Sequence, residues 1–199
     1  MVREGSPAKR AAIVRAALKV FLAEGYARAG VDAIAAEAGV SKRTIYDYYG
    51  DKERLFLAAI AETRAGHEKG FEALLQETID DATDLEDALF RFGRVFATEV
   101  AKSAERTEIL RLMIAEAAHF PRLLADRPTR TALADRLEAL HRRGLLDVPD
   151  PVEAAEFLGV LVTGPVQNRT WYGAVPVDQD EIDHLVRSGV RIFLAAYGR

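Results

Sequence analysis

The chain has 199 residues, no cysteine and a net charge of −4, with 49% apolar and 29% charged residues. This composition is typical of one or two globular domains, and it excludes disulfide frameworks and cysteine-based zinc sites. The N-terminal residues lack the apolar core of a secretion signal. The longest uncharged apolar run, residues 157–168, is shorter than the roughly 20 residues that span a bilayer. We therefore expect a cytoplasmic protein with no membrane segment.

Charge is distributed unevenly along the chain. Residues 1–54 hold 10 Lys and Arg against 7 Asp and Glu, an excess of +3, whereas the remainder holds 17 against 24, an excess of −7. A basic segment attached to an acidic body is typical of a local surface for nucleic acid. The distribution therefore favours a DNA-binding element near the N-terminus, although the net charge is negative.

The first helix signal is Ser6-Pro7, where a serine N-cap precedes a proline at the first helical position. Apolar residues then recur at helical spacing until Gly25, which ends the helix. A second short helix is predicted over about 31–38, and a glycine ends it as well. A third follows directly, because Ser41 can cap a helix that runs to about Tyr48.

The rest of the chain predicts longer amphipathic helices. The expected landmarks are a start at Gly50-Asp51, apolar stripes over 85–100 and 109–120, a start or break at Pro121 and Pro128, a helix end near Gly144, and two last helices at about Pro151–Tyr172 and Gln179–Tyr197. No segment alternates like a β-strand. The sequence therefore predicts an all-α protein of about nine helices. We place the domain boundary near residue 50, between a head over residues 1–50 and a helical body over residues 51–199.

Two short helices joined by a glycine turn, with another helix packed behind them, describe a helix-turn-helix. The second helix of such a unit fits the major groove of DNA. The small side chains of Ala35, Ala36 and Ala38 allow the two helices to approach closely, and Val40 and Ile45 can fill the gap between them. The head is therefore expected to bind DNA through the helix that begins after Ser41.

This arrangement leaves five side chains of the third helix pointing outward, namely Lys42, Arg43, Thr44, Tyr46 and Asp47. Arginine can bind guanine with two hydrogen bonds, and threonine or tyrosine can contact a thymine methyl group or a phosphate. Lys52 adds a charge that a phosphate can meet. The alternative is that the tyrosines are core residues and the charges a solvated face. We favour the core alternative for Tyr49 alone, which we expect to hold the third helix against its neighbours.

The segment from Gly25 to Phe56, GYARAGVDAIAAEAGVSKRTIYDYYGDKERLF, resembles the DNA-binding head of the tetracycline-repressor (TetR) family of bacterial regulators. The matching positions are Ile34-Ala35, the run 38–41, Tyr46, Tyr49, Lys52 and Leu55-Phe56. The C-terminal VRIFLAAYG, 190–198, is also similar to the last helix of many members. The middle resembles the family only in its helices and in the element HFPRLL, 119–124.

The resemblance implies roles for individual residues of the head. Lys42, Arg43, Thr44 and Tyr46 fall where members touch bases or adjacent phosphates, and Tyr48 and Lys52 fall where members hold the DNA backbone. Two positions depart from the family pattern. Gly30 stands where members often have a serine or threonine that binds a phosphate, so that contact is either missing or replaced by Arg28. Asp47 stands where an aromatic or basic residue is common, so it either accepts from cytosine or pairs with a nearby arginine.

Catalytic signals are weak. None of the four histidines has a partner at metal-ligand spacing, and GYARAG lacks the Lys-Ser/Thr of a phosphate-binding loop. We expect no enzyme activity, no metal and no cofactor. Two alternatives to a DNA-binding regulator remain open. One is a helical ligand-binding module whose helix-turn-helix contacts protein, which would lack salt-dependent DNA binding. The other is a small all-α enzyme with Glu116 or His119 as general base.

A single head offers too little contact for a specific site, so a homodimer on a palindromic operator is expected. The last two helices are the predicted interface, because they carry more apolar surface than one core needs. The interface residues predicted on them are Val152, Leu158, Val162, Val166, Ile182, Val186, Val190 and Phe193. Small Gly159 and Gly189 would allow close approach.

The body is expected to bind a small aromatic or amphipathic effector, because aromatic walls with a few polar groups suit such a molecule. The residues predicted to line this site are Phe92, Phe96, Met113, Glu116, Phe120, Asn168 and Trp171. Pro165 is expected to break its helix and free a carbonyl. The family resemblance implies that the ligand shifts the fourth helix, spreads the two heads and releases the protein from DNA. We therefore expect a repressor, with activation left open as an alternative.

Overall fold

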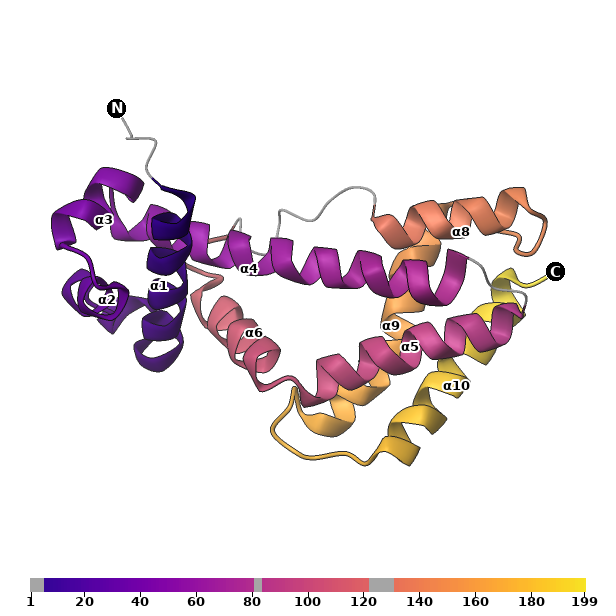
Figure 1. Ribbon diagram of the computed structural model, residues 1–199. Helices are drawn as coiled ribbons and strands as arrows, with labels where there is room; N and C mark the ends of the chain where they lie inside the picture. Colours follow the sequence, from indigo (N-terminus) through magenta and orange to yellow (C-terminus); the bar gives the residue numbers. More distant parts are fainter. Residues whose placement is uncertain (1–5, 81–83, 122–130) are drawn as a thin grey trace. The chain divides into compact units, whose positions relative to one another are not determined.

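The computed structural model describes residues 6–80, 84–121 and 131–199 (Figure 1). Over these ranges the chain forms nine α-helices and a short π-helical turn, and its one β-bridge joins Leu146 to Gly198. The predicted all-α fold is thus confirmed. Within the same ranges, no helix combines the length and apolar composition that a membrane span requires. The predictions made for Pro128 and for residues 122–124 lie outside the described residues.

The described residues divide into two compact units. Unit 1 lies within residues 1–68 and 108–126, and unit 2 within residues 69–107 and 127–199. This division differs from the boundary predicted near residue 50. The reason is packing, because Leu55, Phe56, Ala59 and Ile60 follow that boundary and yet are buried in the core of the head.

Unit 1 is built on a three-helix head. It contains α1 (Pro7–Arg28), α2 (Val31–Ala38), α3 (Lys42–Tyr49), the first part of α4 (Lys52–Leu75) and most of α6 (Ala104–Glu116). As predicted, the backbone leaves helical geometry at Gly25, whose φ is +75°. The centre of the core is a cluster of aromatic rings, Phe21, Tyr26, Phe56 and Phe120, with neighbouring centroids 4.8–6.0 Å apart. Rings at such spacing pack favourably in edge or offset geometry.

Unit 2 is a helical bundle. It contains the end of α4, the π-turn η1 (Gln76–Asp80), α5 (Leu85–Lys102), α8 (Ala132–Arg142), α9 (Pro151–Thr170) and α10 (Gln179–Tyr197). Helix α10 packs against α9 and α5, and α8 packs against α9. The predicted start of α9 and both predicted ends of α10 agree with the structure.

Pro165 does not break α9, contrary to expectation, and the helix continues to Thr170. Proline has no backbone N–H, so the carbonyl one turn earlier, that of Leu161, loses its usual helical donor. This carbonyl lies against Gly189 of α10, where a Cβ atom would stand 2.8 Å from the Leu161 carbonyl carbon. The absence of a side chain at Gly189 therefore allows α9 and α10 to pack closely at the proline.

Candidate DNA-binding surface and ligand cavity

The turn between α2 and α3 is fixed by local backbone chemistry. Gly39 ends α2 in the left-handed conformation, with φ +64° and ψ +34°, which glycine adopts without a steric penalty. Ser41 then caps α3, since its Oγ accepts a hydrogen bond of 3.1 Å from the Thr44 backbone N–H. The Thr44 hydroxyl lies 2.8 Å from the same Oγ. These contacts set the direction in which α3 leaves the turn.

Helix α3 is held to the head by its inner face. Ile45 is fully buried, and the Tyr49 hydroxyl donates to the backbone oxygen of Arg10 at 3.4 Å. Burial of the ring raises the pKa of this hydroxyl, because a phenolate is disfavoured away from water. The Arg10 guanidinium lies 5.7 Å from the ring centroid of Tyr48. Tyr49 thus lies where we expected it, between α3 and α1.

The outer face of α3 presents charge and aromatic surface to solvent. The Arg43 side chain is 91% exposed and Tyr46 is 41% exposed. Asp47 lies 4.0 Å from Arg43, between Oδ2 and Nε, one turn along the helix. Of the two roles left open for Asp47, the geometry favours pairing with arginine in the free protein. Thr44 is half-buried at the start of α3. Its hydroxyl lies beside the capping oxygen of Ser41, so it is less available to DNA.

Lys42 is held by a carboxylate that the sequence interpretation overlooked. Its Nζ lies 2.9 Å from Oδ2 of Asp32, an exposed residue in the first turn of α2. The hydrogen bond to Asp32 and its charge raise the pKa of Lys42. Because an acidic residue in the first turn of a helix is common for electrostatic reasons, the sequence alone did not single out Asp32.

Lys52 and Arg28 both lie at the junction where α1 ends and α4 begins. The Lys52 ammonium donates to the Ala27 oxygen at 3.3 Å and lies 4.6 Å from the ring centroid of Tyr26. Arg28 Nε donates to the Glu24 oxygen at 3.0 Å. Lys52 is therefore a structural contact within the head in addition to its predicted role toward a phosphate. The N-cap of α2 is Gly30, which has no side chain to cap the helix.

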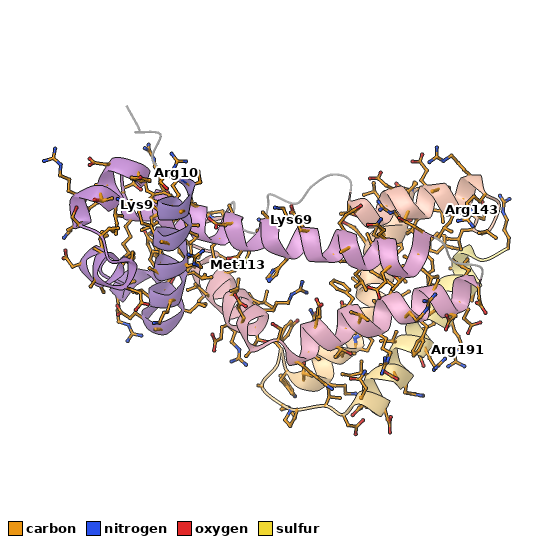
Figure 2. All side chains as sticks on the ribbon, viewed as in Figure 1. Lys9, Arg10, Lys69, Met113, Arg143 and Arg191 are labelled. Atoms are coloured by element: carbon orange, nitrogen blue, oxygen red, sulfur yellow. The ribbon has the colours of Figure 1, made fainter. Side chains whose placement is uncertain are left out.

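Two further basic residues extend this surface. Lys9 and Arg10 are exposed in the first turns of α1 (Figure 2), and Arg10 reaches Tyr48 of α3 as described above. In the sequence, the short basic run that follows Pro7 was the only indication that these residues belong to the DNA-binding surface. Such runs are common on solvated helix faces, which is why the sequence interpretation missed Arg10.

Unit 2 contains a cavity of about 490 Å³, within the range of small-molecule sites. It lies among α4, α5, α8 and α9. Its walls are formed by Phe71, Phe96, Thr131, Leu133, Val152, Ala155, Glu156, Gly159, Val160 and Thr163. A second hollow in the same unit, near Asp84 and Arg187, has about 200 Å³. The larger cavity is therefore the better candidate for a ligand.

The seven predicted effector residues are divided between the two units. Of the four in unit 2, Phe96 lines the cavity, and Phe92 is fully buried beside it, with ring centroids 5.8 Å apart. Asn168 and Trp171 are exposed and do not line it, and Trp171 ends α9 with a φ of +47°.

The other three predicted effector residues lie in unit 1. Phe120 belongs to the aromatic core there, Met113 packs against the same core, and Glu116 is half-buried. The prediction placed all seven around one ligand because helical stripes show which faces are apolar but not which faces meet. The cavity residues that it missed include Phe71, Glu156 and Thr163.

The predicted interface residues are likewise assigned to another role. Seven of the eight are at most 1% exposed and belong to the core of unit 2, namely Leu158, Val162, Val166, Ile182, Val186, Val190 and Phe193. Val152, the eighth, is half-buried at the cavity wall. Side chains buried within their own subunit offer no surface to a partner, so a dimer needs the outer faces of the same helices.

No cluster of metal-binding side chains occurs among the residues that the structure describes. The family model "Bacterial regulatory proteins, tetR family" matches residues 13–59, and "AefR-like transcriptional repressor, C-terminal domain" matches residues 87–199.

Individual relatives agree with these matches. A TetR-family regulator from Mesorhizobium loti is 27% identical, with a TM-score of 0.85 over 99% of this chain and 100% of that one. The Flavonoid-responsive Regulator FrrA is 28% identical, with a TM-score of 0.77 over 97% and 98%. The regulator YxaF of Bacillus subtilis is 26% identical over 79% of this chain and 81% of that protein. The helix-turn-helix head and the matched body together establish that this chain belongs to the tetracycline-repressor family of DNA-binding transcriptional regulators.

Proposed function

We propose that this protein is a repressor that binds a palindromic operator as a homodimer and leaves it when a small molecule occupies the cavity of unit 2. The observation that carries the DNA-binding part is the outer face of α3, where Arg43 and Tyr46 are exposed beside the buried Ile45. A helix anchored on one face and presenting arginine on the other fits direct readout in the major groove. Repression is supported by the repressor family whose model matches the body. Such a regulator would act in the cytoplasm, where bacterial DNA lies.

The contacts divide into base readout and phosphate binding. Arg43 is free enough to reach base edges, while Lys42, Arg10 and Arg28 are suited to phosphates because they lie around α3 or at the start of α2. Phosphate contacts position a protein on DNA without reading sequence. Thr44 and Tyr48 are half-buried, so we propose that they contact the DNA backbone at the edge of the surface formed by α3.

Asp32 opposes DNA binding, because its carboxylate holds Lys42 and repels phosphate. Replacing Asp32 with asparagine is expected to raise affinity for every DNA sequence several-fold, and to steepen the dependence of log K on log salt by about one unit. Titrations of operator and scrambled DNA at several salt concentrations measure both quantities. Glu68→Gln, which removes an exposed carboxylate farther along α4, serves as the charge-matched control. An Asp32→Asn slope equal to that of the wild type would contradict this role.

For the homodimer we propose the outward faces of α9 and α10. Phe157 of α9 is 49% exposed, and Ile192 of α10 is 57% exposed. Apolar side chains exposed on two adjacent helices are typical of a protein interface. Sedimentation equilibrium of the wild type tests this assignment, and a monomer at micromolar concentration would contradict it.

The effector proposal rests on the cavity among α4, α5, α8 and α9. Two aromatic rings, Phe71 and Phe96, form part of its wall, with centroids 5.1 Å apart. The similar regulator FrrA is described as flavonoid-responsive, which supports an aromatic effector for this chain as well. A ligand can release DNA only if it binds the DNA-free state more tightly than the bound state.

Release is tested with a panel of aromatic compounds, flavonoids included, that are scored for dissociation of the protein from operator DNA. An active compound should lose at least about tenfold of its potency on Phe96→Ala, because one wall of the cavity is removed. It should retain its potency on Phe90→Ala, which removes a ring near the second hollow. Equal potency on both variants would place the effector elsewhere.

A further inference from the structure

The charge at the cavity wall indicates what kind of aromatic molecule fits there. We infer that the cavity of unit 2 selects aromatic cations, with the Glu156 carboxylate as counter-charge and the rings of Phe71 and Phe96 as walls. This inference rests on the proposed effector function and specifies the chemistry of the same cavity.

Among the described residues that line the cavity, Glu156 is the one that carries a charge. It lies on α9 next to the buried Ala155, and its own side chain is exposed. The carboxylate forms no ion pair with any residue in the described ranges. A negative charge at the wall of a largely apolar cavity attracts a cation and repels a carboxylate.

The two threonines of the wall provide little for an anion. The Thr163 hydroxyl donates to the Gly159 oxygen at 2.7 Å, so its hydrogen is already used. The Thr131 oxygen accepts from the Ala134 backbone N–H at 3.3 Å as the cap of α8. One hydroxyl hydrogen therefore remains for a ligand, compared with a full carboxylate charge from Glu156.

A basic side chain lies near the ring of Phe96 but does not line the cavity. The Arg106 guanidinium lies 6.0 Å from the Phe96 ring centroid, but Arg106 is not part of the cavity wall. It also lies 3.6 Å from Glu99, between Nη2 and Oε2, so its charge is partly compensated.

The aromatic walls favour a cation as well. The faces of Phe71 and Phe96 carry the negative side of the ring quadrupole, and an ammonium near such a face is attracted to it. The two planes are inclined by 62°, so a flat ligand can lie against one ring while its substituent meets the other. A carboxylate combined with two aromatic rings is thus suited to a flat molecule bearing one positive charge.

Three naphthalene probes of similar size separate charge from shape, namely 2-(aminomethyl)naphthalene, 2-naphthalenemethanol and 2-naphthoate. Their binding to the full-length protein is measured by calorimetry at pH 7. We expect the amine to bind wild type about tenfold more tightly than the alcohol, and naphthoate to bind more weakly than either. Glu156→Gln should bring amine and alcohol within about threefold of each other. Glu153→Gln, one turn earlier on α9 and outside the cavity wall, should retain the preference.

These measurements distinguish a loss of charge selection by Glu156 from a failure of the proposed effector site. An unchanged amine preference in Glu156→Gln, naphthoate binding as tight as the amine, or an amine that does not bind wild type would each overturn the inference. If Phe96→Ala weakens all three probes while Glu156→Gln changes nothing, the cavity is a ligand site without charge selection, and the inference is overturned while the proposed effector site stands. The proposed operator binding is measured separately on DNA, so its loss would show independently of these affinities.

Discussion

Replacing Gly189 with alanine is expected to lower the free energy of unfolding of unit 2 by about 3 kcal/mol, at the upper end of the usual cost of overpacking. The new Cβ would overlap the backbone oxygen of Leu161 and stand 2.8 Å from its carbonyl carbon. A backbone atom in the middle of a helix cannot swing away as the end of a side chain can. The two helices must therefore separate, and α9 and α10 together hold much of the core of this unit.

Gly70→Ala provides the matched control. Gly70 lies in α4, and a Cβ there would meet nothing within 4 Å. Alanine is favoured over glycine inside a helix by up to about 1 kcal/mol, so this variant should be slightly more stable than the wild type. Urea unfolding followed by circular dichroism measures both changes. Equal stability of Gly189→Ala and Gly70→Ala would show that α9 and α10 do not approach as closely as described.

Replacing Arg43 with alanine is expected to cost about 1–3 kcal/mol of operator binding and to relax the preference at one base pair of each half-site. The guanidinium is nearly fully exposed and its nearest charged partner, Asp47, is 4.0 Å away, so the side chain is available to a base edge. Electrophoretic or fluorescence titrations with operator and scrambled DNA measure the difference between the two.

Arg43→Lys is the informative companion variant. Lysine keeps the positive charge but lacks the planar pair of donors that matches guanine. It should therefore retain the affinity of the wild type for scrambled DNA while losing much of the preference for the operator. Equal losses of Arg43→Ala on operator and scrambled DNA would indicate that residue 43 contacts phosphate instead.

The head could be predicted in detail because its signals are local. A proline at the start of α1, glycines at positions 25 and 39, and the Ser41 cap determine where these helices begin and end, and each acts on its own backbone. The 3.6-residue period then determines that Ile45 is buried and that Arg43 and Tyr46 are exposed. The outward set on α3 was therefore predictable, whereas the Asp32 partner of Lys42 depends on the angle between two helices.

The body was less predictable because its features depend on which helices meet. The apolar stripe of Phe120 gave no sign that this residue packs with Phe56 and Tyr26 instead of facing a ligand. Similarly, α9 and α10 carry more apolar residues than the contact between these two helices can bury. Only the helical bundle shows that α5 and α8 cover most of them. Pro165 was expected to break α9, but the helix continues to Thr170, and α10 packs closely against it at Gly189.

The central claim is that a dimer reads DNA through α3. Selection of binding sites from random double-stranded DNA, performed with the full-length protein, tests it most directly. A dimer that reads DNA through α3 should enrich a sequence with two-fold symmetry, whose half-sites are centred about one helical turn, roughly 10 base pairs, or a multiple of it apart. Failure to enrich any sequence, or enrichment of a single half-site without its symmetric partner, would contradict DNA binding by such a dimer.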